Sequence, residues 1–357
     1  MSEIKPVSIS YVDFKAGKDF TEEVTEAFGA NGLGLIVVRD LPDFQKERQA
    51  ALRAIRKFAD LPEETKEKYT DSKSNYSVGW SHGKEKMRNG VPDTAKGSYY
   101  ANPLDDIITD DQYLKENFPE LYADNIWPGE DMPELEPAFK EMTHVQLGVG
   151  YMICELFDRY LHSKTNGLHP AGHFLEMLRR GTTCKGRLLH YFPAPPTASK
   201  SQDGLCGWHL DHGGITILTC PLYLDMQRNE IPAPSDCGLH IKHPTDGSIV
   251  KVTLPPDCML VQLGESFQYL SGGHLRATAH CVKSSQTPDI TRETLALFMD
   301  WMPEEVMKLP EYTRPYSEVV HTPFLPEGVP ELEGRIKGAK HYRDFAKNTY
   351  TAYYCEK

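Results

Sequence analysis

The sequence predicts a mainly β fold with flanking helices: a double-stranded β-helix (jelly-roll) barrel with an N-terminal α/β cap and a long supporting helix. Short apolar or alternating runs, separated by turn residues, follow one another between residues 186 and 302, as is typical of strands. No helical segments are interleaved with these runs, which favours a double-sheet jelly roll over a parallel βαβ sheet. A long amphipathic stretch precedes them and needs a broad apolar surface, such as the outside of a sheet.

Four regions are expected along the 357 residues. Residues 1–130 form the cap region with a polar loop, and residues 131–180 form the supporting helix and a connection. Residues 181–305 form the barrel, and residues 306–357 form a tail and helix that pack on the barrel or over its mouth. No internal repeat or low-complexity tract is visible.

The cap region begins with a short strand over residues 7–11, a helix over residues 20–28 and a buried strand over residues 34–38. Two helices follow on either side of Leu61-Pro62, because proline interrupts a helix but suits the first turn of the next one. Residues 72–112 are polar and contain several glycines and aromatic residues, which is typical of lids and substrate loops. We expect most of these aromatic side chains to pack on the barrel.

One long helix is predicted over Pro133–Leu161, because its apolar residues recur every three or four positions. After a glycine- and histidine-rich connection, seven runs are predicted to contain strands: GRLLHYFP, HGGITILTC, GLHIKH, SIVKVTLP, CMLVQLGE, ATAHCV and TLALFMDW. Asp246-Gly247 between two of them is typical of a hairpin. The tail after Pro303 is proline-rich until Pro330 and turns helical around residues 336–354.

The net charge and the distribution of apolar residues disfavour several classes of partner. The formal net charge of −12 disfavours nucleic acid and anionic membrane surfaces. The N-terminus lacks the basic start and apolar core of a signal peptide, and the longest apolar run, near Leu33–Val38, is far too short for a membrane span. We therefore expect a cytoplasmic protein with no membrane partner. The sequence makes no prediction of the oligomeric state.

The eight cysteines form no C-x-x-C pair and no small-domain framework, so they are interpreted as buried, reduced thiols. A zinc site that combines Cys206 or Cys220 with His209 is an alternative, but no second cysteine or histidine completes a familiar spacing. The cysteines stand at positions 154, 184, 206, 220, 237, 258, 281 and 355.

The stretch Gly207–Thr219, GWHLDHGGITILT, carries the first candidate metal ligands. His209 and Asp211 are two residues apart in a segment that continues with the period of a strand, so both side chains are expected on one face. An imidazole and a carboxylate on one face can share a divalent cation of the iron type. An H-x-D pair also occurs by chance, so the remaining site residues decide its meaning.

Two later segments supply those residues. His280 ends a strand-like run, and a strand follows whose inward positions carry a cation and a hydroxyl: Arg292, Thr294, Ala296 and Phe298. His212 competes as a ligand but has the wrong strand parity relative to His209. His274 also competes, but it lies beside the Gly272-Gly273 turn, so His280 is preferred. A surface ion pair is the alternative interpretation of Arg292.

The order H-x-D, distal His, R-x-T resembles the 2-oxoglutarate/Fe(II)-dependent dioxygenases, in particular the plant and fungal group that is similar to isopenicillin N synthase. The residues that carry the resemblance include His209-Leu210-Asp211, His280 and Arg292-Glu293-Thr294. The flanks MLVQLGESFQYLSGGHLRATAH and RLLHYFPAPP add to it. The resemblance covers most of the chain and is most specific between Arg187 and Met302.

The resemblance implies a function for each residue. His209, Asp211 and His280 would be the catalytic metal ligands, with Fe(II) as the metal. Arg292 and Thr294 would bind the far carboxylate of the co-substrate 2-oxoglutarate, because a guanidinium keeps its charge and can donate two hydrogen bonds. Molecular oxygen would complete the reaction, in which decarboxylation of 2-oxoglutarate drives oxidation of a small organic substrate.

Two departures from the family pattern leave alternatives open. Thr294 stands where the family commonly has serine, which keeps the hydroxyl. His190-Tyr191-Phe192-Pro193 stands where it commonly has Asn-Tyr-Tyr-Pro, and Phe192 lacks a hydroxyl that often helps to bind the co-substrate. We expect Tyr191 to point to the other face of the sheet. An Fe(II) oxidase that needs no 2-oxoglutarate, or a jelly-roll binding protein without catalysis, are the alternatives.

Overall fold

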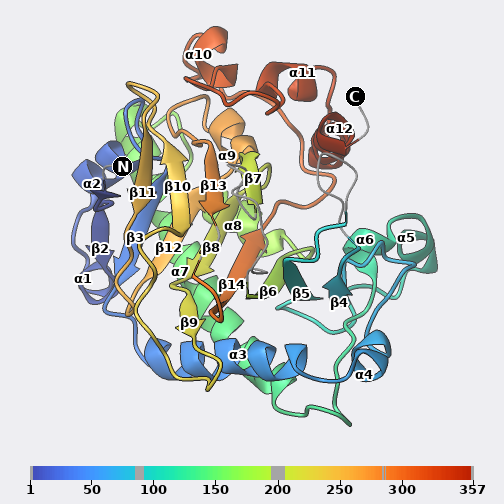
Figure 1. The fold of residues 1–357 in the computed structure, drawn as a ribbon. Coiled ribbons are helices and arrows are strands. Elements are labelled where there is room, and N and C mark those ends of the chain that lie inside the picture. Colours follow the sequence, from blue (N-terminus) through green and yellow to red (C-terminus); the bar gives the residue numbers. More distant parts are fainter. Residues whose placement is uncertain (1–2, 85–91, 194–205, 284, 286, 355–357) are drawn as a thin grey trace.

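The computed structural model describes residues 3–84, 92–193, 206–283, 285 and 287–354, in which two sheets are surrounded by helices (Figure 1). The first sheet has five strands, in the order β1 (Glu3–Ile4), β11 (Ile249–Val252), β10 (Gly238–Lys242), β13 (His280–Lys283) and β7 (Cys206–His209). The second has nine, in the order β2 (Ser8–Ser10), β3 (Leu35–Arg39), β12 (Met259–Leu263), β8 (Ile215–Thr219), β14 (Thr291–Met299), β6 (Lys185–Tyr191), β5 (Lys96–Ala101) and β4 (Gly79–His82), with β9 (Leu222–Leu224) paired to β14.

Each of the seven runs predicted between residues 186 and 302 contains a strand, so that part of the prediction is confirmed. The short strand β9 was not predicted, and the residues of β7 were expected only as part of a longer strand that continues to Thr219. Among the described residues the strands form two separate sheets, which is consistent with the predicted double-sheet jelly roll, but they do not close into a barrel.

An apolar cluster packs the two sheets face to face. Val37 on β3 and Leu260 on β12 come from the nine-stranded sheet, and Ile241 on β10 and Val252 on β11 come from the five-stranded sheet. All four side chains are buried. Facing sheets that bury alternate residues in this way stabilise each other through removal of apolar surface from water.

The predicted hairpin at Asp246-Gly247 joins β10 to β11. The Gly247 N–H donates to the carbonyl oxygen of His243 at 3.0 Å. Gly247 has a φ of 70°, a conformation that glycine adopts without steric cost. The hairpin signal in the sequence is therefore confirmed.

The N-terminal region contains α1 (Tyr11–Lys15), α2 (Thr21–Phe28), α3 (Phe44–Ala59) and α4 (Glu63–Glu67). Pro62 directly precedes α4, which confirms the predicted break between the two helices. The expectation of a polar loop over residues 72–112 is wrong for β4 and β5, an antiparallel pair that extends the nine-stranded sheet. Residues 85–91 of that segment lie outside the described residues.

Two of the aromatic residues in this segment, Trp80 and Tyr99, are buried and pack against Phe58 of α3. The hairpin is followed by two short helices, α5 (Gln112–Asn117) and α6 (Pro119–Tyr122).

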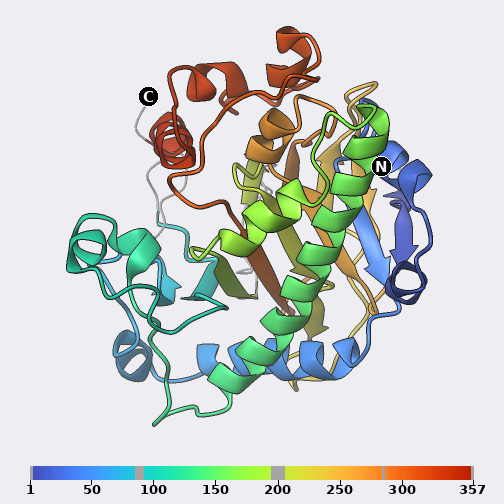
Figure 2. The same ribbon diagram turned by 180° about the vertical axis from the view of Figure 1, so that it is seen from behind.

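The long helix α7 (Leu135–Lys164) lies against the outer face of the nine-stranded sheet (Figure 2). Gln146 of α7 donates to the carbonyl oxygen of Ile217 on β8 at 2.8 Å, and the rings of Phe139 and other apolar residues cover the sheet. The prediction of one supporting helix is confirmed. A second helix, α8 (His173–Arg180), lies where only a connection was expected.

The short helix α9 (Glu265–Leu270) lies between β12 and β13, where no helix was expected. The C-terminal part contains α10 (Tyr316–Val320), α11 (Leu332–Ile336) and α12 (Tyr342–Tyr354) (Figure 1). The helix expected around residues 336–354 begins at Tyr342. The tail packs beside β7, because Val329 and Tyr353 share an apolar cluster with Leu210 and Ala279.

Six cysteines are free and buried, in agreement with the predicted reduced thiols: 154, 184, 220, 237, 258 and 281. Cys355 and the side chain of Cys206 lie outside the description. Among the described residues, no helix is both long enough and apolar enough to cross a bilayer.

Candidate active site

His209 and His280 lie side by side on two paired strands of the five-stranded sheet. His209 is the last residue of β7 and His280 the first residue of β13, and they are direct cross-strand partners with ring centroids 4.3 Å apart. Asp211 lies two residues beyond β7, in the connection to β8. The expectation that His209, Asp211 and residues 215–219 belong to one strand is wrong, because β7 and β8 belong to different sheets.

Three ligand atoms nevertheless converge. The Nδ1 atoms of His209 and His280 face the carbonyl oxygens of Gly207 at 2.8 Å and Thr278 at 3.2 Å, which leaves both Nε2 atoms for a metal. The Oδ1 atom of Asp211 lies 3.5 Å from Nε2 of His209 and 3.8 Å from Nε2 of His280.

The second carboxylate oxygen of Asp211 has a different partner. The Thr216 hydroxyl on β8 donates to Oδ2 at 2.6 Å, which orients the carboxylate. Within the described residues, His209, Asp211 and His280 are the group whose ligand atoms all lie within 4.8 Å of one another. Such a set of two imidazoles and one carboxylate fits a divalent metal of the iron type.

The protonation states also suit a metal. Burial alone would raise the pKa of Asp211, but His280, His209 and the Thr216 hydroxyl hold it well below its usual range. Burial, with help from His209, lowers the pKa of His280 to about 4. An ionised carboxylate and a neutral imidazole are the forms that bind metals.

The competing ligands lie apart from this group. The Nε2 atom of His274 is 3.0 Å from the carbonyl oxygen of Tyr312, and the ring of His212 stacks on Tyr342. The Cys220 thiol contacts the carbonyl oxygens of Pro221 and Leu254, so it gives no support to a zinc site with His209.

Arg292 extends its guanidinium over the inner face of the nine-stranded sheet. It lies between two cross-strand partners, Tyr191 on β6 and Tyr223 on β9, and its Cζ is 4.8 Å from the Tyr191 ring centre. Its Nε and Nη1 atoms are buried without a hydrogen-bond partner among the described residues. Buried donors of this kind require an acceptor, and a bound anion would supply one.

Thr294 follows Arg292 on the same face of β14, as the alternation in the sequence predicts. Its hydroxyl donates to the carbonyl oxygen of Thr219 at 3.2 Å and lies 3.4 Å from the Thr219 hydroxyl. The hydroxyl therefore also bonds to the neighbouring strand β8.

The comparisons with known proteins agree with this geometry. Residues 5–130 match the family model described as the N-terminal region of non-haem dioxygenases in morphine synthesis. The 2-oxoglutarate-dependent dioxygenase citB of Monascus ruber is 26% identical over 216 residues, which cover 59% of this chain and 57% of citB. Over these segments the chain is similar to 2-oxoglutarate/Fe(II)-dependent dioxygenases. The matches fit the expected resemblance to the isopenicillin N synthase-like group.

A further curated relative, a UPF0676 protein of Schizosaccharomyces pombe, is 33% identical over 122 residues, or 33% of each chain. The chain thus matches between one third and somewhat more than half of the length of these curated relatives.

Two solved structures have the same fold as this chain. A 2OG-Fe(II) oxygenase family protein of Caulobacter crescentus has a TM-score of 0.68 and 20% identity, over 96% of this chain and 97% of that one. A full-length protein of Neurospora crassa, solved with α-ketoglutarate, has a TM-score of 0.68 and 18% identity, over 96% and 95% of the two chains.

The position of Tyr191 differs from the expectation. Tyr191 was expected on the other face of the sheet, but it pairs with Arg292 across the strands and shares its face. Phe192 instead packs against the rings of His82 and His190. Phe192 has no hydroxyl, but Tyr191 supplies one to the surface beside Arg292. The alternation of residues along the strand, counted back from Pro193 to Arg187, could have placed Tyr191 on this face.

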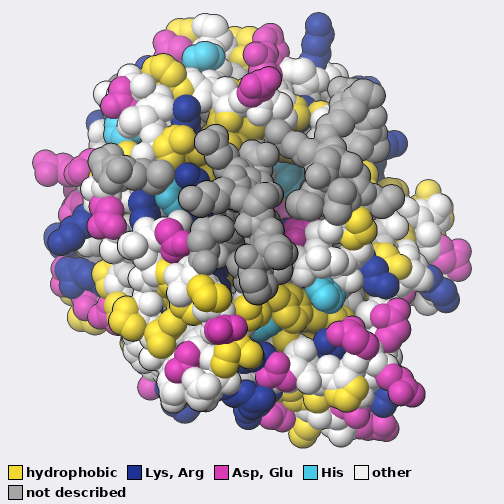
Figure 3. All heavy atoms as spheres, viewed as in Figure 1, with side chains coloured by type: hydrophobic (Ala, Val, Ile, Leu, Met, Phe, Trp, Pro, Cys, Tyr) yellow, Lys and Arg dark blue, Asp and Glu magenta, His cyan; other side chains and the backbone are white. Residues whose placement is uncertain are grey.

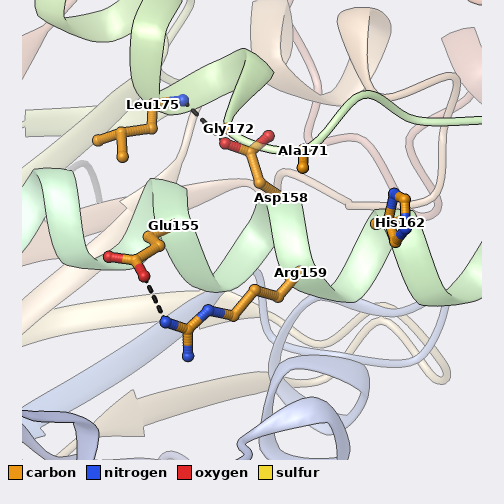
Figure 4. Close-up of a pocket in the computed structure, with 7 residues that line it drawn as sticks. All are labelled: Glu155, Asp158, Arg159, His162, Ala171, Gly172 and Leu175. Carbon is orange, nitrogen blue, oxygen red and sulfur yellow. Dashed lines mark hydrogen bonds and ion pairs between the residues drawn. The ribbon is translucent and has the colours of Figure 1, made fainter. Parts of the chain in front are cut away.

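A cavity of about 450 Å³ lies between α7 and α8, outside this active site (Figure 4). Its acid Asp158 accepts hydrogen bonds from the backbone N–H groups of Phe174 and Leu175, and it contacts His169 Nε2 at 2.6 Å. The Asp158 carboxylate thereby caps the first turn of α8. Since α7 covers the outer face of the nine-stranded sheet and Arg292 lies on the inner face, this cavity is not the catalytic one.

Proposed function

We propose that the protein is a non-haem Fe(II) oxygenase that couples oxidative decarboxylation of 2-oxoglutarate to hydroxylation, or a related oxidation, of a small organic substrate. The observation that carries the proposal is the convergence of Nε2 of His209, Nε2 of His280 and Oδ1 of Asp211 beside the sheet that bears Arg292, whose buried Nε and Nη1 atoms have no hydrogen-bond partner among the described residues. A metal triad alone would fit many activities. The triad together with a buried cation that has two unused donors fits a metal whose co-substrate has a free carboxylate.

In this proposal the three ligands hold Fe(II) from one side. The bound metal would supply the redox chemistry that activates molecular oxygen. The backbone carbonyl groups of Gly207 and Thr278 would hold the Nδ1 protons of His209 and His280, which leaves both Nε2 atoms to the metal. Asp211 would supply the single negative charge, oriented by Thr216.

Arg292 would bind the far carboxylate of 2-oxoglutarate through Nε and Nη1, in the bidentate manner of a guanidinium. Tyr191 and Tyr223 would keep the guanidinium in place from both sides. Thr294 would be positioned two residues away on the same face. We assign Tyr191 to this co-substrate site in addition to the two residues inferred from the sequence.

The remaining features are assigned in the same way. The two facing sheets would be the two halves of a jelly roll. Residues 181–305 would form the catalytic core, supported by residues 1–130, 131–180 and 306–357.

A small substrate is supported by structural neighbours solved with small molecules, JOX2 with JA and the Neurospora crassa protein with thymine. Charges of both signs are scattered over the visible face, which supports the expectation that nucleic acid is not a partner (Figure 3). The free, buried cysteines support a cytoplasmic location.

The test is an oxygen-free titration of the Fe(II)-loaded protein with 2-oxoglutarate, followed by visible absorption. Chelation of the metal by the keto acid should produce a weak charge-transfer band that saturates. Asp211→Ala should lose both the metal and the band. If the parent binds Fe(II) but develops no band, the protein is an oxidase without this co-substrate or a binding protein, and the proposal fails.

A further inference from the structure

Lys185, the first residue of β6, has an ammonium group that is buried. Its Nζ atom has no hydrogen-bond acceptor among the described residues. A buried charge without a partner destabilises a folded protein, so such groups are uncommon unless a ligand supplies the opposite charge. Burial lowers the pKa of Lys185 to about 8, so the group is still mostly protonated at neutral pH.

The strand register places Lys185 on the same face of the sheet as Thr216, the residue that orients the metal ligand Asp211. Lys185 is the cross-strand partner of Phe298 on β14, and Phe298 is the partner of Thr216 on β8. Cross-strand partners point to the same face of a sheet. The Thr216 hydroxyl orients the metal ligand Asp211. The backbone of Lys185 lies two strand spacings, or about 10 Å, from the backbone of Thr216.

The surface around this row is apolar. Leu189, Tyr191 and Ala296 form a cluster with Leu218 and Phe298 on the inner face of the nine-stranded sheet. Arg292 lies at the opposite end of β14 from Phe298, and so at the opposite end of this apolar floor from Lys185. A co-substrate held between the metal and Arg292 would therefore leave Lys185 to a different ligand.

The neighbouring charges do not satisfy Lys185. Arg187, two residues along the same face, donates to the Ser98 hydroxyl at 2.9 Å and lies over the ring of Tyr100. Glu120 on α6 is the acid whose charge acts on Lys185, but its side chain is exposed and makes no hydrogen bond to Nζ. One unpaired ammonium suits a singly charged group, whereas a phosphate would call for several cations or a helix N-terminus.

We propose that Lys185 binds a carboxylate of the primary substrate. The substrate is then an organic acid with an apolar body that lies over Phe298, between Lys185 and Thr216. Its oxidised carbon is several bonds away from the carboxylate, toward the metal ligands. The oxidation rests on the proposed function, but the binding of the acid does not.

The experiment measures binding to the full-length chain without added iron or 2-oxoglutarate, by calorimetry and thermal shift. The probes are butanoate, hexanoate, octanoate, decanoate and 3-phenylpropanoate, together with their uncharged amides and hexyl phosphate. The variants are Lys185→Met, Lys185→Arg and Arg292→Met, and Lys308→Met is the control because Lys308 is an exposed lysine. At least one acid should bind the parent, Lys308→Met and Arg292→Met with similar affinity. Lys185→Met should bind it about 10- to 100-fold more weakly, and Lys185→Arg should recover part of the loss.

Several results would overturn this assignment. If no acid binds the parent, or if Lys185→Met binds as tightly as the parent, Lys185 has no role in carboxylate binding. If Arg292→Met loses the acid instead, the probe occupies the co-substrate site. Tighter binding of amides or of hexyl phosphate would exclude the carboxylate. Because no iron is present, these outcomes are independent of the charge-transfer test of the proposed function.

Discussion

Arg292 brings a permanent charge to a buried position, and its Nε and Nη1 atoms have no partner among the described residues. Loss of a hydrogen bond to a charged group costs about 1.5–3 kcal/mol. Arg292→Met should therefore weaken the apparent affinity for 2-oxoglutarate about 10- to 100-fold in the anaerobic titration. Arg292→Lys should recover only part, because an ammonium cannot form the bidentate contact.

Iron affinity is the internal control for Arg292, since this residue is not a ligand and its variants should bind Fe(II) like the parent. An unchanged 2-oxoglutarate affinity in Arg292→Met would show that the guanidinium serves another anion. In an oxidase that needs no 2-oxoglutarate, the substitution would instead raise the apparent constant of the substrate, and added 2-oxoglutarate would have no effect.

Lys185 gives a second prediction for a single residue, on stability and pH. Its pKa falls from the ordinary 10.5 to about 8 in the fold because of burial, so below pH 8 the folded protein holds an ammonium that would be better solvated in the unfolded chain. Lys185→Met should raise the free energy of unfolding of the ligand-free protein by about 1–3 kcal/mol at pH 7.

The pH profile of that gain follows from proton linkage. Between about pH 8 and pH 10.5 the unfolded parent binds more protons than the folded parent, so the parent gains stability as the pH rises. The advantage of Lys185→Met should therefore shrink over this range in urea unfolding experiments. An advantage that stays constant from pH 7 to pH 10.5 would contradict the buried ammonium.

The site residues show how far sequence reasoning reaches at this scale. His209, Asp211, His280 and Arg292 could be found because spacing and chemistry together restrict them. The face of Tyr191 could not be read from a four-residue phrase, since one residue of register exchanges the two faces of a strand. The pairing of Tyr191 with Arg292 decides it.

Among the larger elements, α7 supports the sheet that carries Arg292. The Phe139 ring is buried and fits against β6 at Gly186, where an added Cβ would lie 2.4 Å from the ring. Phe139→Ala should lower the free energy of unfolding by about 3–5 kcal/mol through the cavity it leaves. Glu141→Ala, at an exposed position of the same helix, is the matched control and should change it little. A variant at Phe139 that melts like the parent but oxidises a different substrate would place α7 in the site.

The elements that the sequence concealed are those without a clear apolar pattern of their own. The strand β5, KGSYYA, contains two polar residues and a glycine, and it is recognisable only through its pairing with β6. The helix α8 has eight residues, too few for a clear period, and its start depends on the distant carboxylate of Asp158. Both are fixed by tertiary contacts, which local patterns do not contain.

On the scale of the whole molecule, the C-terminal tail is tied to the loop that carries the metal ligand Asp211. Arg335 on α11 forms a buried ion pair with Glu265, at 2.5 Å between Nη2 and Oε1. The backbone N–H of Glu265 donates to the carbonyl oxygen of Asp211 at 2.8 Å. Tyr353 on α12 accepts a hydrogen bond from the backbone N–H of Leu210 at 3.4 Å. The sequence predicted a tail on or over the sheets, but a partner 70 residues away in the chain has no local signature.

Because of this connection, a substitution in the tail should weaken metal binding. Arg335→Leu leaves the Glu265 carboxylate buried and unpaired, which should cost about 3–5 kcal/mol of stability and weaken Fe(II) binding through the Asp211 backbone. The double variant Arg335→Leu with Glu265→Leu removes the orphaned charge, so it should regain most of the stability. Iron affinity, measured by competition with a chelator, should recover in parallel if the ion pair acts by positioning the loop. Should the single variant lose stability while its iron affinity stays at the parent value, the tail supports the fold without organising the site.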